Sequence, residues 1–149
     1  MARYSLPRAE RWPKVEQTPL PTKNRKTILV VDGDPAVLRF VSELLVEGNY
    51  NVVTARSGSL ALEQSREFKN DIDLHLSEFQ MTGMNGMDLA TQMSRDRPNL
   101  QVLLMSGFPD GMLVLNEGWH FLAKPFIPSQ LRTLVSGLVS PGKPSRFSK

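Results

Sequence analysis

The sequence contains no cysteine, few aromatic residues and no long apolar run. Without cysteine, disulfide bonds and thiolate metal sites are excluded. No apolar stretch approaches the roughly 18 residues that a membrane-spanning helix needs, and the first residues lack the apolar core of a secretory signal. These absences favour a cytoplasmic protein without a membrane partner.

Two other kinds of binding signature are also missing. The phosphate-binding motifs G-x-G-x-x-G and G-x-x-x-x-G-K-[ST] do not occur, so nothing indicates a nucleotide cofactor. The two histidines, His75 and His120, are isolated and show no metal-ligand spacing. His75 lies within an apolar run, which predicts a neutral, hydrogen-bonded residue of the core.

The charge is divided unevenly along the chain. Residues 1–26 carry seven Lys or Arg and two acids, residues 141–149 carry three basic residues, and the part between them is net acidic. An acidic domain argues against a nucleic-acid groove, although basic ends can add weak attraction to nucleic acid or acidic proteins. We expect a basic, proline-rich arm at 1–26, one domain at 27–140 and a basic tail at 141–149, with both ends disordered. Trp12 is the exception in the arm, because its side chain is suited to docking on the domain or on a partner.

Apolar runs and breakers alternate between residues 27 and 140. Strands are predicted at 27–32, 50–55, 72–77, 101–105 and 120–123, and helices at 35–47, 57–68, 85–95, 109–116 and 128–139. Asp34 and Pro35 form a helix start, Gly48-Asn49 a helix end, and Pro128 a second helix start. This alternation predicts an α/β fold: a flavodoxin-like, doubly wound, five-stranded parallel sheet in the order 2-1-3-4-5, with helices on both faces.

Four polar residues fall at or just after the ends of different predicted strands. They are Asp32, Glu78, Ser106 and Lys124. Open parallel sheets bind ligands beyond the carboxyl ends of their strands. The topology therefore predicts that these four side chains converge.

Several segments around these residues resemble the receiver domain of two-component response regulators. They are residues 28–32 with Asp34-Pro35, residues 81–86, residues 103–107 and residues 121–126. The resemblance extends over about residues 27–140. In that family an aspartate at the end of the third strand accepts a phosphoryl group, acids after the first strand help hold Mg²⁺, and a Ser/Thr and a Lys contact the phosphoryl oxygens.

Applied to this sequence, the resemblance places Glu78 at the phosphoacceptor position. Asp32 and Asp34 join it in an acidic pocket, and Ser106 and Lys124 are the equivalents of the phosphate contacts. A metal site here would depend on Asp32 and Glu78.

Two departures affect the same reaction. Gly33 replaces a metal-site acid, and Glu78 extends its carboxylate by about 1.5 Å beyond the reach of an aspartate, where a misplacement of about 1 Å can slow a reaction on the order of 100-fold. We therefore expect no catalytic residue and a Mg²⁺ site that is weak if it forms. Phe121 falls at the position of the family's switch aromatic.

The resemblance and its departures lead to one main hypothesis. The chain is interpreted as a standalone atypical receiver that is not an enzyme and acts by protein–protein contacts with little or no phosphorylation. Its partners would be a histidine kinase or a downstream target, with a homodimer contact across residues 109–116, 120–123 and 128–139, including Phe121 and Pro125-Phe126. One alternative is a phosphorylatable response regulator with an unusual site, and another is a flavodoxin-like binder of small molecules.

Overall fold

The computed structural model describes residues 24–107 and 118–139, which form one parallel sheet and the helices that cover it. The strands are β1 (Thr27–Val31), β2 (Asn51–Ala55), β3 (Leu74–Glu78), β4 (Gln101–Ser106) and β5 (Trp119–Ala123). The helices in these ranges are α2 (Pro35–Glu47), α3 (Gly58–Glu67), α4 (Gly86–Asp96) and α5 (Pro128–Leu138). None of the helices in the described residues is long and apolar enough to cross a membrane.

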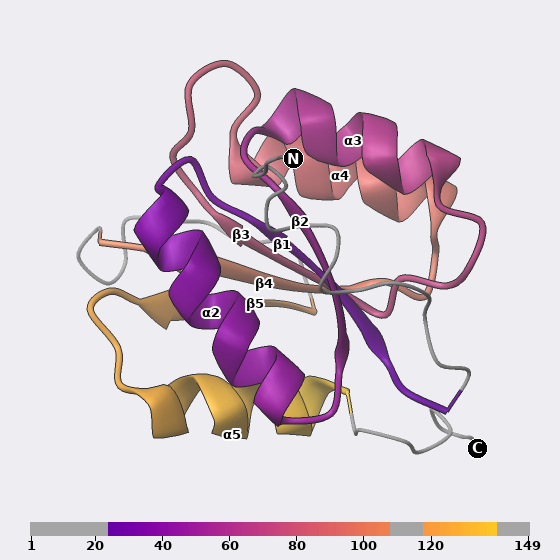
Figure 1. Ribbon diagram of the computed structural model, residues 1–149. Helices are drawn as coiled ribbons and strands as arrows, with labels where there is room; N and C mark the ends of the chain where they lie inside the picture. The colour runs from indigo at the N-terminus through magenta and orange to yellow at the C-terminus, as the bar shows by residue number, and fades with distance from the viewer. Residues whose placement is uncertain (1–23, 108–117, 140–149) are drawn as a thin grey trace, which may run out of the picture.

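The sheet has the predicted order, β2-β1-β3-β4-β5, with all pairs parallel. Helices α2 and α5 cover one face and α3 and α4 cover the other (Figure 1). Both faces are therefore apolar, and β1 is buried along its whole length. A short run of β-branched and leucine residues suits such a central strand, because each side chain enters one of two cores.

The helix starts follow the chemistry of their first residues. The Asp34 carboxylate accepts a hydrogen bond from the Ala36 N–H at 2.9 Å, and Pro35 occupies the first turn of α2. Asn49 follows α2 in the left-handed conformation, with φ of 71°. Pro128 begins α5. The predicted start and end of α2 and the predicted start of α5 are thus confirmed.

Most element boundaries lie within one or two residues of the predictions. The clearest correction concerns β3, which begins at Leu74 and includes Glu78 as its last residue. Glu78 is in register with Met105 of β4, and the following Phe79 N–H still donates to the Met105 carbonyl at 2.7 Å, so pairing continues past the expected strand end. Ile72 is buried but lies outside the strand. The helix predicted at 109–116, the arm to residue 23 and the tail from residue 140 lie outside the described residues.

Candidate functional site

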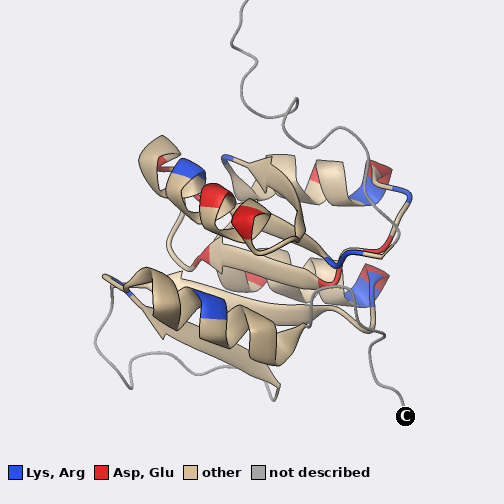
Figure 2. Cartoon of the chain, turned by 60° about the horizontal axis from the view of Figure 1, so that its bottom comes forward, with Lys and Arg blue, Asp and Glu red and all other residues tan. Residues whose placement is uncertain are grey.

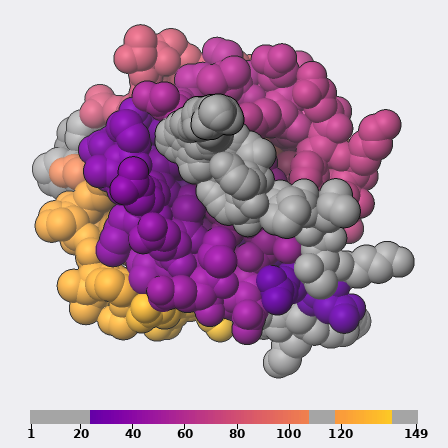
Figure 3. Space-filling model, in the orientation of Figure 1, coloured from indigo at the N-terminus to yellow at the C-terminus, as the bar shows by residue number. Residues whose placement is uncertain are grey.

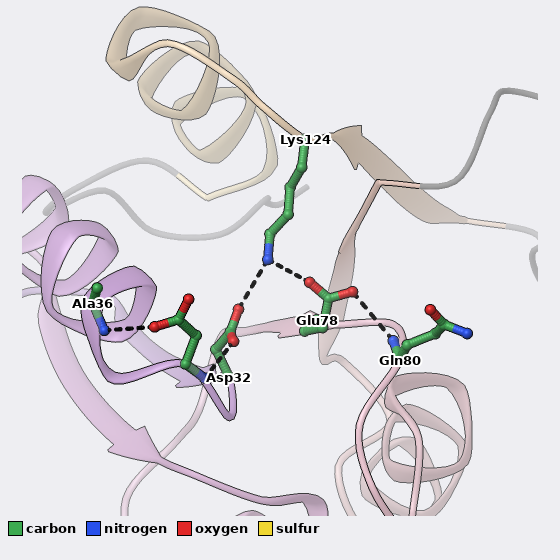
Figure 4. A network of polar contacts seen from close by, with 6 residues as sticks. Asp32, Ala36, Glu78, Gln80 and Lys124 are labelled. Atoms are coloured by element: carbon green, nitrogen blue, oxygen red, sulfur yellow. Dashed lines mark hydrogen bonds and ion pairs between the residues drawn. The ribbon is translucent and has the colours of Figure 1, made fainter.

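Three charged side chains meet at the carboxyl edge of the sheet. Asp32 follows β1, Glu78 ends β3 and Lys124 follows β5. Figure 4 shows the Lys124 ammonium pointing between the two carboxylates. It donates to Asp32 Oδ2 at 3.2 Å and also to Glu78 Oε1. The predicted convergence of these three residues is confirmed.

The ion triad, Asp32–Glu78–Lys124, is largely withdrawn from water. The Asp32, Glu78 and Lys124 side chains are 4%, 14% and 24% exposed. Burial by itself lowers the pKa of the Lys124 ammonium, but the hydrogen bond with Glu78 and the negative charges of Asp32 and Glu78 outweigh it, so that the pKa is raised above its usual value. Lys124 is accordingly a fixed cation at neutral pH.

The remaining carboxylate oxygens in the triad are held by backbone groups. The Asp34 N–H donates to Asp32 Oδ1 at 2.9 Å, and the Gln80 N–H donates to Glu78 Oε2 at 3.3 Å (Figure 4). Asp34 itself is exposed and its carboxylate caps α2, so the structural role predicted for it is confirmed. Gln80 was not singled out from the sequence, because its contact uses the backbone and leaves no mark in residue type.

Ser106 and Phe121 occupy the same region of the fold. Ser106 ends β4, is 1% exposed, and its carbonyl accepts the Lys124 N–H at 2.8 Å. Phe121 is half-buried in β5, in register with Leu104. The phosphate-contact role of Ser106 and the switch role of Phe121 stay predictions.

Two close backbone approaches hold the loop after Glu78. A Cβ on Gly86 would lie 2.5 Å from the Glu78 carbonyl and 2.8 Å from Ser77 Oγ, and a Cβ on Gly58 would lie 2.8 Å from the Met84 carbonyl. Only glycine fits such contacts without displacing the loop. The loop between β3 and α4 is thereby pressed against the strand end and the start of α3. These contacts, of Gly58 with Met84 and of Gly86 with Glu78, are not evident from the sequence because they depend on how the loop packs.

A neutral polar pair lies beneath the site, inside the core. His75 is fully buried, with Nε2 2.8 Å from Ser77 Oγ and Nδ1 3.5 Å from Met93 Sδ. Burial lowers the pKa of His75 to about 3. The prediction of a neutral, hydrogen-bonded core histidine is confirmed.

The donor set at this edge does not fit a Mg²⁺ ion. Mg²⁺ requires several oxygen ligands in octahedral geometry. Gly33 contributes no carboxylate, the Lys124 ammonium already bridges Asp32 and Glu78, and no group of three or more His, Cys, Asp or Glu suited to a metal occurs among the described residues. The chemistry that this arrangement supports directly is internal charge pairing.

An open depression of about 520 Å³ lies beside the triad. Besides the predicted acids, it is lined by Arg56 and Ser57 after β2 and by residues of the loop after β3. Arg56 was missed in the sequence because nothing in its surroundings distinguishes it from a solvated surface arginine. Its place next to Gly33 arises only from the pairing of β1 with β2, which aligns Val31 with Ala55.

The fold and the ion triad define an open α/β sheet with its polar site at the carboxyl edge. Residues 28–136 match the family described as "Response regulator receiver domain". This match covers more than half of the chain, and the protein therefore belongs to the receiver-domain family of two-component signalling. Membership settles the fold family and the signalling class, and it places the chain with signalling modules rather than with flavodoxins.

Curated relatives place the same domain in longer proteins. The chain is 35% identical over 118 residues to the two-component response regulator ARR14 of Arabidopsis thaliana, covering 75% of this chain and 30% of that protein. It is 29% identical over 122 residues to the transcriptional regulatory protein GlrR of Escherichia coli (strain K12), covering 79% of this chain and 27% of the relative. The chain thus spans less than a third of the length of either relative.

Solved structures agree with the fold. A response regulator receiver domain protein from Clostridium thermocellum superposes with a TM-score of 0.69 at 26% identity, covering 76% of this chain and 94% of the other. The signal receiver domain of an HD domain-containing protein from Pseudomonas fluorescens Pf-5 gives a TM-score of 0.69 at 27% identity, covering 77% and 94%. The likeness extends over almost the whole of each solved domain.

Proposed function

We propose that this receiver signals by protein contacts without phosphotransfer, and that the ion triad holds the site in one charge state. The observation that carries the proposal is the single Lys124 ammonium bridging Asp32 and Glu78. In the family a lysine contacts the transferred phosphoryl group. Here the Glu78 carboxylate already contacts the equivalent lysine, so a covalent modification is not needed to engage it.

The same geometry disfavours Glu78 as an acceptor of a phosphoryl group. An attacking carboxylate oxygen needs an unobstructed approach and a cation that offsets charge on the transferring group. Glu78 Oε1 is bound to Lys124 and Oε2 accepts the Gln80 N–H. Gly33 removes an acid that would help hold the metal. Both requirements are therefore weakened at once.

The partners of such a module are proteins. Receiver domains interact with histidine kinases and other signalling proteins, and we assign this chain the same class of partner. Phe121 in β5 and Pro125-Phe126 before α5 belong to the surface that we propose for this contact, together with residues 109–116, which lie outside the described residues. A homodimer contact across this surface belongs to the same proposal.

A phosphorylation assay with restoring variants tests the proposal. The full chain is incubated with Mg²⁺ and acetyl phosphate, and its intact mass is followed beside that of the Gly33→Asp/Glu78→Asp double variant. Aspartate fits at position 33, because a Cβ there meets only the Arg56 carbonyl, at 3.8 Å. We expect no mass increase for the natural sequence and a base-labile phosphoryl adduct on the double variant.

The matched control is Gly33→Asn/Glu78→Asn, which has the same shape as the restored pair without its charge. It should bind no Mg²⁺ in isothermal titration calorimetry and gain no mass. A stoichiometric adduct on Glu78 or Asp32 of the natural sequence overturns the proposal in favour of the phosphorylatable alternative.

A further inference from the structure

An exposed apolar surface lies where α2 meets the start of α5. It consists of Phe40, Phe126 and Ile127, here called the Phe40 surface. Phe40 is 42% exposed and Ile127 is 59% exposed, although both are large hydrophobic residues. The rings of Phe40 and Phe126 pack with centroids 6.3 Å apart at an interplanar angle of 31°. Phe40 and Phe126 therefore form one patch, and the exposed Ile127 follows Phe126 directly in the chain.

This patch differs from single exposed apolar residues, which are common on soluble proteins and need no explanation. Leu60 on α3 is equally exposed, at 46%, but lies on the helix layer of the opposite sheet face. In the Phe40 surface, Phe40 and Phe126, 86 positions apart in sequence, are brought together where α2 packs on α5. Figure 3 shows the N-terminal and C-terminal parts of the described chain, indigo and yellow, side by side on this face. Clustered exposed apolar groups of this kind mark a contact site.

Charged residues border the patch along α2. Glu43 and Glu47 follow Phe40 by one and two helical turns, and Arg39 precedes it directly. Figure 2 shows acidic and basic residues in red and blue on the helices of the chain. Arg132 of α5 lies 3.9 Å from Glu47, whose side chain is 71% exposed. The two acids and two bases of this border balance, so the apolar side chains distinguish the surface and favour an apolar or aromatic anchor.

Residues 1–23 of the same chain supply such aromatic anchors. They contain five Lys or Arg, two Glu, and the aromatic residues Tyr4 and Trp12. The segment joins the domain at Asn24, close to the end of α2, since the Asn51 N–H donates to the Lys26 carbonyl at 2.9 Å and Asn51 comes four residues after α2 ends.

The tether is long enough to reach the patch. Phe40 lies seven residues before the end of α2, a distance of about 10 Å along the helix at 1.5 Å per residue. The twelve residues from Trp12 to Asn24 can span up to about 40 Å. A tethered ligand of this kind acts at an effective concentration in the millimolar range, so even a weak contact is occupied.

From the exposure of the apolar side chains and the length and attachment point of the tether, we infer that residues 1–23 dock on the Phe40 surface, with Trp12 as the apolar anchor. The docked segment covers Phe40 and Ile127 and competes with any partner for this face. The inference concerns a surface distinct from the ion triad and does not depend on the charge state of Glu78.

Trp12 itself provides the test, because the sequence contains only two tryptophans. Trp119→Phe in the full chain leaves Trp12 as the sole indole. We expect blue-shifted emission and protection from acrylamide quenching. Adding Phe40→Ser and Ile127→Ser should return both signals to their solvent-exposed values.

The matched control is Leu60→Ser in the same Trp119→Phe background. It removes an equally exposed leucine from another helix and should leave the emission of Trp12 unchanged. Circular dichroism verifies that each variant is folded.

Two outcomes overturn the inference. One is a solvent-exposed Trp12 in the variant that keeps the Phe40 surface intact. The other is a Trp12 signal that depends on protein concentration and disappears together with dimers in analytical ultracentrifugation, since the occupant is then a second copy. Neither outcome bears on phosphorylation, so failure here is distinguishable from failure of the proposed function.

Discussion

Each edge of the sheet contains a cation that joins separate elements, but the two cations contact different chemical groups. At the carboxyl edge, Lys124 contacts the carboxylates of Asp32 and Glu78. At the amino edge, Arg97 donates to the carbonyls of Ser65 at 2.8 Å, Phe68 at 2.9 Å and Asn70 at 3.0 Å.

Arg97 has a structural role, whereas Lys124 belongs to the candidate functional site. Carbonyls at the end of a helix keep their partial charge at every pH and need donors to replace the missing helical bonds, so Arg97 stabilises the end of α3. The Lys124 ammonium instead compensates two negative charges, those of Asp32 and Glu78, so its contribution depends on charge pairing. The Arg97 contacts therefore hold the end of a helix, whereas the Lys124 contacts fix the charges of the candidate site at the carboxyl edge.

The largest loss of stability is expected at Gly86, which packs against the backbone of Glu78 at the carboxyl edge. Gly86→Ala places a Cβ 2.5 Å from the Glu78 carbonyl, and such overpacking should lower the free energy of unfolding by about 3 kcal/mol. Urea unfolding followed by circular dichroism measures it. The control is Gly137→Ala in α5, where a Cβ has no neighbour within 4 Å and should be neutral or slightly stabilising. Equal stabilities of the two variants would contradict the close packing of the loop.

The second prediction removes the cation at the amino edge and asks whether the carboxyl edge changes. Arg97→Met removes the donors to three carbonyls and should destabilise the protein by about 2 kcal/mol. Arg95→Met, at an exposed neighbouring position, is the control and should be close to neutral. NMR shifts of Glu78 and Lys124 should remain unchanged in both variants. A large shift there on Arg97→Met would show that the edges are coupled rather than separate.

Protonation of His75, which is buried in the core between the two edges, should destabilise the folded protein. The folded pKa of His75 is about 3, below its ordinary value of 6.5, so the unfolded chain binds a proton that the folded chain does not. The stability contribution of neutral His75 is complete above pH 6.5 and is lost as pH falls toward 3, by about 2 kcal/mol at pH 5. Between pH 7 and pH 4, the free energy of unfolding of His75→Gln should fall less steeply than that of the natural protein. Parallel pH profiles for the variant and the natural protein would refute this.

The smallest effect is expected for the triad, because Lys124 is about a quarter exposed. Lys124→Met leaves two carboxylates without their cation and should lower stability by about 1 kcal/mol at pH 7. The folded pKa of Lys124 is raised, so its contribution is complete below the ordinary value of 10.5 and is lost as pH rises through the folded pKa. The difference between variant and natural protein should therefore shrink above pH 10.5, as seen by chemical denaturation. A constant difference at all pH values would place the role of Lys124 in packing rather than charge.

Much of the site was accessible from the sequence because strand ends in a parallel sheet meet at one edge. The positions of Asp32, Glu78 and Lys124 followed from that rule. The contacts of Gly86 with Glu78, of Arg97 with the end of α3, and of Phe40 with Phe126 did not follow. Each of these contacts depends on how the helices and loops pack on the sheet, and a local sequence pattern does not predict that packing.

By itself, the sequence determined the fold class, the strand order and the helix starts at Asp34 and Pro128. These features rest on periodicity, local capping chemistry and residue identity. Only the tertiary structure decided that one ammonium serves both Asp32 and Glu78, and that Phe40 and Phe126 form one exposed surface. The physical reason is that side-chain pairing depends on distances between elements, and these distances are fixed only when both faces of the sheet are packed.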